Sequence, residues 1–295
     1  MIEFRNVSAS YDGELPVLRD VSLTIPDGDF VAFAGTNGAG KSTTMRLING
    51  LLKPTSGEVL LDGVPTTALR TSEVARKVGF LFQNPDRQIC QPTVREELLF
   101  GFTAVGEGGP DAEACVDAMI EAFGFDADAE PFLLNRGTRQ LLALASIIVR
   151  EPDVVVLDEP TTGLDYRECA KVMEAVGRLN AAGATVVMVC HDMEVVGDYA
   201  RRVIAMTAGT VVDDGPTFKV LRRPETLRRA HLLPPQVTEV SMLLGADPAL
   251  AGTAVARADT LDEMAAAVAA LASEAARAAA RERAALGACA PMGGE

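Results

Sequence analysis

A glycine-rich loop carries the most specific chemistry in the sequence. Residues 35 to 42 read Gly-Thr-Asn-Gly-Ala-Gly-Lys-Ser, a complete G-x-x-x-x-G-K-[ST] pattern, and the apolar run 30–34 comes directly before it. This order predicts a strand, a phosphate-binding loop and a helix. Backbone N–H groups of such a loop surround a β-phosphate, Lys41 reaches the β- and γ-phosphates, and Ser42 offers its hydroxyl to Mg²⁺. The predicted contacts to a nucleoside triphosphate are Gly35, Thr36, Asn37, Gly38, Ala39, Gly40, Lys41, Ser42 and Thr43.

A pair of carboxylates follows an apolar run later in the chain. Residues 154–157 read Val-Val-Val-Leu, and Asp158 and Glu159 come directly after them. Open α/β sheets place their ligands at the carboxyl ends of such strands. One carboxylate there can hold Mg²⁺ opposite Ser42, usually through water, and the next can polarise an attacking water. An Asp-Glu pair after four apolar residues is weak support by itself, so the interpretation depends on the residues downstream.

The composition bounds the possible partners. The chain has 295 residues, enough for one large domain or two unequal ones, and its 27 basic and 41 acidic residues give a net charge of −14. Phosphate backbones bind basic faces, so this balance disfavours nucleic acid as a partner. The longest apolar runs are far shorter than the roughly 18 to 20 residues of a membrane span, so we expect membrane association only through a partner.

The cysteines favour a reducing compartment. They form an odd set without C-x-x-C spacing, which argues against disulfides and against a metal site. Cys169 and Cys190 lie within apolar patterns, so we expect buried thiols. The five cysteines are Cys90, Cys115, Cys169, Cys190 and Cys289.

The predicted elements alternate as in a wound α/β sheet. Residues 154–157 and 185–189 are short runs rich in β-branched residues, as expected of parallel strands covered on both faces. Between the phosphate loop and these strands, residues from about 85 to 150 have a helical pattern. This pattern predicts a helical insertion into the sheet domain.

A change of pattern after Pro216 predicts a second region. The strand pattern ends there, and an alanine-rich helix is expected over 261–286, with Thr260 and Glu263 as a capping box. We expect this region to hold two subunits together; a helix folded onto its own domain, or a partly disordered end, is the alternative. The predicted divisions are a nucleotide-binding domain over 1–216, a helical C-terminal region over 217–286 and a flexible tail over 287–295.

Four motifs in this order resemble those of the ATP-binding cassette family. They are the phosphate loop, Gln83 after the apolar run 78–82, the segment 158–165 that reads Asp-Glu-Pro-Thr-Thr-Gly-Leu-Asp, and His191 after the next apolar run. The resemblance covers about residues 2–215. It implies an α/β fold of the P-loop NTPase class, a cassette with an N-terminal antiparallel β-subdomain, a helical insertion and a small helical C-terminal region.

The resemblance also implies roles for single residues. Gln83 is the loop glutamine that senses Mg²⁺, the attacking water and the transmembrane partner, while Asp165 is the dimer-contact aspartate. His191 is the switch histidine on the γ-phosphate, and Tyr11 falls where the family stacks the adenine. Glu159 orients or deprotonates the attacking water. The implied Mg²⁺ ligands are Ser42, Gln83 and Asp158.

The segment after Gln83 places the chain more narrowly. Residues 84–89 read Asn-Pro-Asp-Arg-Gln-Ile and resemble the short Pro-Asp-x-Gln helix in ATPases of energy-coupling factor transporters. An ordinary Asn-Pro turn that opens a helix explains Pro85 and Asp86 but not Gln88. The resemblance implies that these three residues dock onto the transmembrane partner. An ATPase of an ordinary importer is the main alternative.

One motif departs from the family pattern. The signature loop, ordinarily Leu-Ser-Gly-Gly-Gln, reads Leu134-Asn135-Arg136-Gly137-Thr138 here. Asn135 replaces the serine whose hydroxyl donates to the γ-phosphate of the opposite subunit, although its amide can donate from a slightly different position. Gly137 retains its backbone N–H, while the positions of Arg136 and Thr138 vary more in the family. The signature acts in trans, so the change concerns the other subunit's site; neutral drift in a working loop is the alternative.

Together these features predict ATP hydrolysis that drives membrane transport, with ATP and Mg²⁺ as cofactors. The implied partners are a transmembrane T component, a substrate-binding S component and a second ATPase subunit, which we expect to be a paralogous chain. The chain would lie at the cytoplasmic face of the membrane. The rival hypotheses are a catalytically weak ATP-binding subunit and a cassette protein that acts on chromosomes or ribosomes. Nothing in the sequence identifies the transported solute, and His231 is interpreted as structural or exposed.

Overall fold

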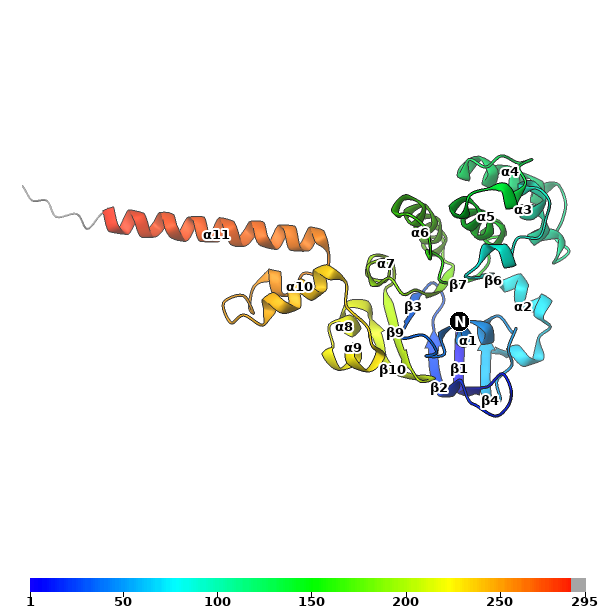
Figure 1. Cartoon of the computed structure of the whole chain (residues 1–295), viewed down its shortest axis with the longest axis horizontal. Helices are drawn as coiled ribbons and strands as arrows, with labels where there is room; N and C mark the ends of the chain where they lie inside the picture. Colours follow the sequence, from blue (N-terminus) through cyan, green and yellow to red (C-terminus); the bar gives the residue numbers. More distant parts are fainter. Residues whose placement is uncertain (288–295) are drawn as a thin grey trace, which may run out of the picture. The chain divides into compact units, whose positions relative to one another are not determined.

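The computed structural model describes residues 1–287, and the chain divides into two compact units, residues 1–232 and the residues from 233 onward (Figure 1). The two units are described separately below. Apart from Gly287, the predicted flexible tail lies outside the described residues. No helix within residues 1–287 is long and apolar enough to span a membrane.

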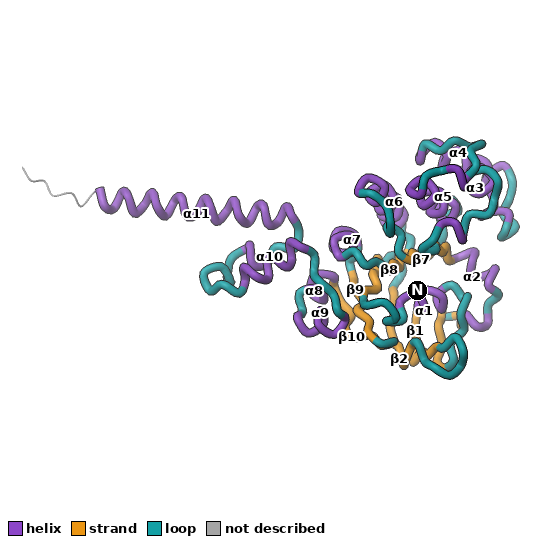
Figure 2. The backbone as a smooth tube through the Cα atoms, viewed as in Figure 1, coloured by secondary structure: helices purple, strands orange, loops and turns teal. Residues whose placement is uncertain are grey.

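Two sheets form the framework of the first unit (Figure 2). In the larger sheet all neighbours are parallel except the outer strand β10, which is antiparallel to β9. Its strands lie in the order β10 (Thr210–Pro216), β9 (Arg202–Thr207), β3 (Phe30–Ala34), β8 (Thr185–Val189), β7 (Val154–Asp158) and β6 (Val78–Leu81). The smaller, antiparallel sheet has the order β2 (Leu18–Ile25), β1 (Ile2–Ala9), β4 (Ser56–Leu61) and β5 (Val64–Pro65). The predicted wound α/β sheet and the N-terminal antiparallel β-subdomain are both confirmed.

The central strands separate two hydrophobic cores. Successive side chains of a strand point to opposite faces, so Phe30 and Ala32 of β3 pack among the helices, while Val31 and Phe33 pack toward the antiparallel sheet. All five residues of β3 are buried. Burial on both faces explains why these strands read as continuous apolar runs without a polar alternation.

Helices enclose this framework. Those of the first unit are α1 (Lys41–Ile48), α2 (Thr71–Lys77), α3 (Val94–Thr103), α4 (Pro110–Phe123), α5 (Arg136–Ile148), α6 (Tyr166–Ala181), α7 (Met193–Tyr199), α8 (Thr217–Leu221) and α9 (Pro224–Ala230). Short 3-10 helices lie at η1 (Thr66–Ala68), η2 (Pro85–Arg87) and η3 (Pro131–Leu133). α3, α4 and α5 pack together as the expected helical insertion, and α5 also contacts β6 and α6 (Figure 1).

The first unit extends to Leu232, beyond the boundary that the sequence placed at Pro216. α8 and α9 pack on β9 and β10. Asp213 of β10 accepts hydrogen bonds from Arg223 and Thr226, which fixes α9 to that strand. Three side chains of these helices are buried in the main core: Val220, Leu221 and Ala230. The two helices therefore belong to the nucleotide-binding domain.

The second unit consists of α10 (Gln236–Gly245), η4 (Ala254–Ala256) and α11 (Leu261–Gly287). The predicted capping box is confirmed, because Glu263 N donates to Thr260 Oγ1 at 3.3 Å and the Glu263 carboxylate accepts from Thr260 N at 3.4 Å. The interior of this unit is small, and it contains Thr238, Ser241, Val255, Ala258 and Ala267. Exposed apolar side chains on its two helices include Val240, Leu243, Leu261 and Val268.

The cysteines only partly match their expected burial. Cys190 is buried, as expected, and burial raises the pKa of its thiol to about 11. Cys169 is half-buried, and the expectation is wrong for Cys90 and Cys115, which are exposed. Cys289 lies outside the described residues.

We expect a chain that ends after Leu232 to remain folded and a chain that ends after Pro216 to be markedly destabilised. The shorter chain loses two large buried side chains, Val220 and Leu221, each of which contributes about 1.5–3 kcal/mol. Thermal unfolding followed by circular dichroism measures the difference, with the full chain as control. Equal melting temperatures for the two truncated chains would contradict this assignment of α8 and α9.

Candidate active site

A pocket of about 440 Å³ lies at the edge of the large sheet where its parallel strands end. The phosphate loop follows β3, Gln83 follows β6, Glu159 follows β7 and His191 follows β8. The pocket is lined by Val17, Asn37, Gly38, Ala39, Gly40, Lys41, Ser42, Thr43, Gln83, Glu159 and His191. The residues predicted from four separate motifs therefore converge on one cavity.

Backbone conformation explains the glycines of the phosphate loop. Gly35 has a φ of 149°, and a Cβ there would lie 2.2 Å from the carbonyl oxygen of Met206, so no larger residue fits. Gly38 has a φ of 80°, but a Cβ there would meet nothing within 4 Å. The first glycine is needed for packing within the chain, whereas the second leaves open space against the loop, where a ligand can approach the backbone.

The amino-terminal end of α1 is suited to an anion. Its N-cap is Gly40, no side chain caps it within the described structure, and no acidic residue lies in its first turn. The first N–H groups of a helix have no partner within that helix, and the helix dipole adds positive potential there. A phosphate at this end would accept hydrogen bonds from these N–H groups, and its negative charge would interact favourably with the helix dipole.

Lys41 is buried beside the loop. Its Nζ donates to the carbonyl oxygens of Gly35 at 2.6 Å and Thr36 at 2.9 Å. Burial lowers the pKa of Lys41, and the nearby carboxylates of Glu159 and Asp158 act in the opposite direction. Bonds between two charged groups are stronger than bonds to neutral carbonyls, so an anionic phosphate oxygen is a better acceptor for this ammonium than its present partners.

Ser42 and Asp158 are in contact beside the phosphate loop. The Ser42 hydroxyl donates to Asp158 Oδ1 at 3.2 Å. Burial raises the pKa of Asp158, and the Ser42 hydrogen bond opposes this shift. No group of three His, Cys, Asp or Glu residues within residues 1–287 could hold a metal unaided. One carboxylate beside one hydroxyl fits Mg²⁺, which binds few protein ligands and completes its octahedron with water and phosphate oxygens.

Glu159 is the centre of the site. Its Oε2 accepts hydrogen bonds from Gln83 Nε2 at 2.6 Å and Thr162 Oγ1 at 3.1 Å, and its Oε1 lies 2.8 Å from His191 Nε2. Its φ of 54° is left-handed, a conformation that costs a residue with a Cβ about 1–2 kcal/mol. A hydrogen bond from Glu159 N to the carbonyl oxygen of Val189 helps to hold it there. The carboxylate is thus fixed between three loops and can serve as a base.

Two of these contacts were not predicted from the sequence. Gln83 Nε2 donates to Glu159, which leaves the amide oxygen of Gln83 as the atom for its predicted role as a Mg²⁺ ligand. Thr162 was given no role, although a hydroxyl three residues after a carboxylate can bond back to it.

Tyr11 lies beside α1, outside the lining of the pocket. Its hydroxyl is 3.3 Å from Thr43 Oγ1, and the residue is 55% exposed. The Arg46 guanidinium lies 5.7 Å from the ring centroid, and Nη1 donates to the tyrosine hydroxyl at 3.2 Å. The sequence analysis did not predict the contact with Arg46. This arginine fixes the hydroxyl end of Tyr11 and packs on its ring.

The signature loop stands apart from the pocket. Asn135 is the N-cap of α5, and its Oδ1 accepts from Thr138 N at 2.8 Å, which leaves its amide NH₂ group as the donor. Arg136 is exposed, and its Nη2 donates to the carbonyl oxygen of Thr162 at 3.3 Å. None of the residues 135–138 lines the pocket of this chain.

Asp165 begins α6 in a capping box with Glu168. Asp165 Oδ1 accepts from Glu168 N at 2.9 Å, and Glu168 Oε2 accepts from Asp165 N at 3.0 Å. The same glutamate packs against Gly137, where a Cβ would lie 1.7 Å from Glu168 Oε1. A larger residue at position 137 would therefore displace this carboxylate from its place in the capping box.

The predicted docking residues differ in exposure. Pro85 is buried. Gln88 bridges two elements within the chain, because its Oε1 accepts from Phe82 N at 3.2 Å and its Nε2 donates to the carbonyl oxygen of Ala143 at 2.7 Å. Asp86 is exposed and is the member of the three that a partner can reach.

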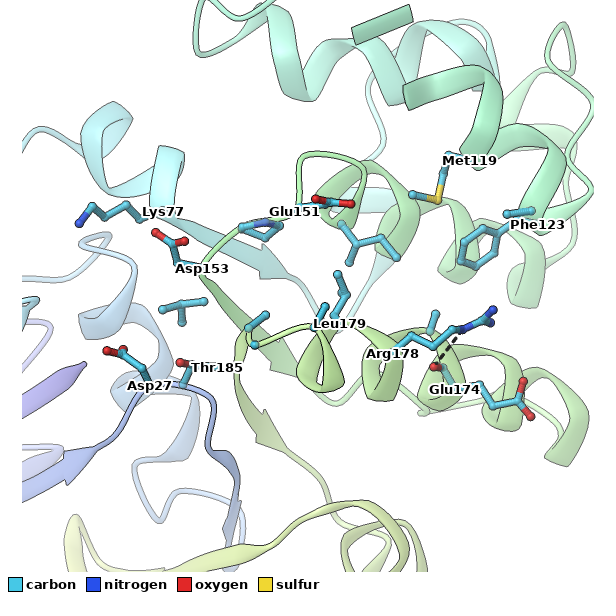
Figure 3. Close-up of a pocket in the computed structure, with 18 of the residues that line it drawn as sticks. Asp27, Lys77, Met119, Phe123, Glu151, Asp153, Glu174, Arg178, Leu179 and Thr185 are labelled. Carbon is cyan, nitrogen blue, oxygen red and sulfur yellow. Dashed lines mark hydrogen bonds between the residues drawn. The ribbon is translucent and has the colours of Figure 1, made fainter. Parts of the chain in front are cut away.

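A larger hollow, of about 960 Å³, lies at the opposite edge of the sheet, where β7 and β8 begin (Figure 3). Met119 and Phe123 of α4 face it from one side, and Glu174 and Arg178 of α6 from another. Its charged residues carry both signs, and it contains none of the loop residues described above. Size alone therefore does not identify the reactive site, whose chemistry is in the smaller pocket.

Comparisons with known proteins agree with this geometry. The family model for ABC transporters matches residues 18–162. EcfA of Methanothermobacter thermautotrophicus, named as an energy-coupling factor transporter ATP-binding protein, is 36% identical over 244 residues, which are 81% of this chain and 78% of the relative. The chain belongs to the ATP-binding cassette ATPases.

Other cassette proteins show how far the similarity extends. A solved dimeric ATP-binding cassette in a post-hydrolysis state with ADP and Pi has a TM-score of 0.67 and 30% identity, over 74% of this chain and 99% of that one. A protein of Methanosarcina acetivorans, named as an ABC transporter ATP-binding protein, is 42% identical over 217 residues. These residues are 73% of this chain, which spans only 35% of that relative's length.

We expect Asp158→Asn to raise the melting temperature of the cassette without nucleotide at neutral pH. A carboxyl with a raised pKa is destabilised by ionisation, so the cost is present above the raised pKa and disappears as the pH falls through it. The advantage of the variant should therefore shrink in acid, while its stabilisation by Mg²⁺ and ATP is lost. Differential scanning fluorimetry across pH measures both effects, with the exposed Asp153→Asn as control. A variant no more stable than wild type at neutral pH would contradict the burial argument.

Proposed function

We propose that this chain is the ATP-hydrolysing subunit of an energy-coupling factor type importer for a vitamin, metal ion or other small solute. The observation that carries the ATPase assignment is the convergence of Gln83, Thr162 and His191 on the Glu159 carboxylate beside the phosphate loop. The relative named EcfA supports the transporter class. An ATPase subunit of an ordinary importer is the alternative, because other relatives carry only the general family name.

The binding half of the mechanism follows from the loop. Amides at the start of α1 and the Lys41 ammonium hold the β- and γ-phosphates, and Tyr11 offers a face to the adenine. Ser42 and Asp158 would hold Mg²⁺, with Gln83 as the third proposed ligand. Bound Mg²⁺ supplies neutralisation of the charge that develops on the transferred phosphoryl group.

The hydrolytic half depends on Glu159. This carboxylate accepts the proton of the attacking water or orients it, and the hydrogen bonds from Gln83 and Thr162 together with the His191 contact hold the carboxylate in one orientation. His191 holds Oε1 of the glutamate from the side of β8 and lies in the pocket lining, so its imidazole can also contact the γ-phosphate. Catalysis here consists of positioning and charge stabilisation.

The assembly would place this chain at the cytoplasmic face of a membrane. Its proposed partners are a transmembrane T component that carries a substrate-binding S component, and a second ATPase subunit. Asp86 and the surface beside Gln83 are the proposed docking residues for the T component. Asp165 and the exposed Val240 and Leu243 of the second unit are the proposed contacts to the other ATPase subunit.

The signature loop favours a paralogous partner over a second copy. In a pair of identical chains both composite sites would receive Asn135, whereas a paralogue can bring a serine to the site that contains Lys41 and Glu159. A catalytically weak member of such a pair is the second candidate function. The retention of Lys41, Asp158, Glu159 and His191 argues against it.

Replacement of Glu159 by Gln should separate binding from chemistry. Loss of a positioned base lowers turnover by about 10² to 10⁴, while ATP binding remains nearly intact. Lys41→Ala is the contrasting control and should weaken nucleotide binding itself. Steady-state ATPase rates of the assembled transporter and ATP titrations measure the two effects. Equal turnover of wild type and Glu159→Gln would exclude the assigned role.

Asn135→Ser should accelerate hydrolysis at the partner's site more than at this chain's own site. Loss of one preorganised donor can cost roughly 2.7–4 kcal/mol, or about 10² to 10³ in rate, and the Asn135 amide should recover only part of this. Hydrolysis per site is compared for the chain alone and for the chain with its paralogous partner. A pair of identical chains as active as the mixed pair, with no gain from Asn135→Ser, would contradict the asymmetry.

A further inference from the structure

We propose that Arg136 and Thr162 are positioning residues that connect the signature loop of this chain to its own carboxylate, Glu159. The inference rests on the proposed ATPase function and adds a coupling between two sites. The signature loop is proposed to act on the nucleotide of the opposite subunit. Through the Arg136–Thr162 contact, the nucleotide state of the opposite subunit's site would alter the position of the Glu159 carboxylate in this chain.

The first step of the connection joins Thr162 to Glu159. Thr162 Oγ1 donates to Glu159 Oε2 at 3.1 Å, and Thr162 N donates to the Glu159 carbonyl oxygen at 3.3 Å. The side chain and backbone of Thr162 are therefore both tied to the glutamate. A displacement of Thr162 changes the donors around the Glu159 carboxylate.

The second step joins Arg136 to Thr162. Arg136 Nη2 donates to the Thr162 carbonyl oxygen at 3.3 Å, and the guanidinium packs on the next residue, Gly163. A Cβ at Gly163 would lie 2.9 Å from Arg136 Cζ and 3.1 Å from Nε, so a larger residue there would displace the guanidinium. The third position of the family's usual signature is glycine, which has no side chain to make this contact. The connection is therefore specific to a chain with arginine at this position.

Two further contacts hold α5 against the loop that contains Thr162. The buried Gln140 of α5 donates from Nε2 to the Pro160 carbonyl oxygen at 3.1 Å. Gly137 packs on Glu168, which also caps Asp165. The first turns of α5 and the segment 160–165 are thus joined at three places, so a shift of the signature loop is transmitted to the segment.

The test uses an ATPase pair in which the partner's catalytic carboxylate is replaced, so that only the Glu159 site turns over. If the pair consists of two identical chains, Glu159→Gln is introduced into one copy, so that only the Glu159 site of the other copy turns over. Arg136→Ala and Thr162→Val should each lower kcat about two- to tenfold, the worth of one hydrogen bond, with little change in the KM for ATP. Because both act through one connection, the double variant should be no slower than the slower single variant.

Two controls accompany this measurement. Thr162→Ser keeps the hydroxyl and should retain the wild-type kcat. Arg178→Ala removes an exposed arginine from α6 at the opposite edge of the sheet and should have no effect. An unchanged kcat in Arg136→Ala, or an additive loss in the double variant, would overturn the connection.

A spectroscopic readout tests the connection without turnover. The chain has two histidines, and His191 Nε2 lies 2.8 Å from the Glu159 carboxylate. In the full chain without nucleotide, Arg136→Ala and Thr162→Val should move the imidazole NMR signals of His191 and leave those of His231 in place. Absence of ATP hydrolysis in wild type would refute the proposed function alone. His191 signals that stay fixed in both variants would refute the connection.

Discussion

The in-register pairing of parallel strands is the constraint on which the site depends. β7 pairs with β8 from Val154 opposite Thr185 to Asp158 opposite Val189, and β3, β6 and β9 extend the same parallel arrangement. Because parallel strands in one register end at a common edge, four loops far apart in sequence leave the sheet side by side. Lys41, Gln83, Glu159 and His191 meet through backbone hydrogen bonds formed some residues earlier. A slip of β7 by one residue would turn its buried side chains to the opposite faces and displace the carboxylates.

The site stores unfavourable free energy that this framework holds in place. Glu159 adopts a left-handed backbone conformation, Lys41 is an ammonium buried among carbonyl oxygens, and Asp158 is a carboxyl whose pKa is raised by burial. Each feature is destabilising by itself. A phosphate beside Lys41 and a cation beside Asp158 would offset the cost of burying these two groups, whereas the backbone strain of Glu159 remains. The central strands β3 and β8 are fully buried, so the chain has rigid support for this strain. Such a site gives up some stability in exchange for preorganisation.

The sequence predicted those parts of the site that depend on local pattern. The phosphate loop, Asp158 and Glu159 follow apolar runs, and a parallel sheet brings the ends of such runs together. Thr162 and Arg46 were not predicted, because their contacts depend on where a turn directs a side chain. The boundary at Leu232 was missed for a related reason: α8 and α9 are short, and their pattern does not reveal which core they bury against. The spacing of apolar residues shows which side of a helix or strand is buried. The tertiary fold decides which other element that side packs against.

The altered signature loop takes part in more than one task within this chain. Asn135 uses its oxygen to cap α5, so only its amide NH₂ group remains to face a ligand, and Gly137 packs against the Glu168 carboxylate. Arg136 extends toward the segment that holds Glu159. The signature loop contacts the segment of its own chain that holds Glu159. In the proposed assembly it also contacts the nucleotide of the opposite subunit, so its position depends on both contacts. A substitution there changes two sites at once, and for this reason paired ATPase subunits of unequal sequence are suited to divide the work of binding and hydrolysis between them.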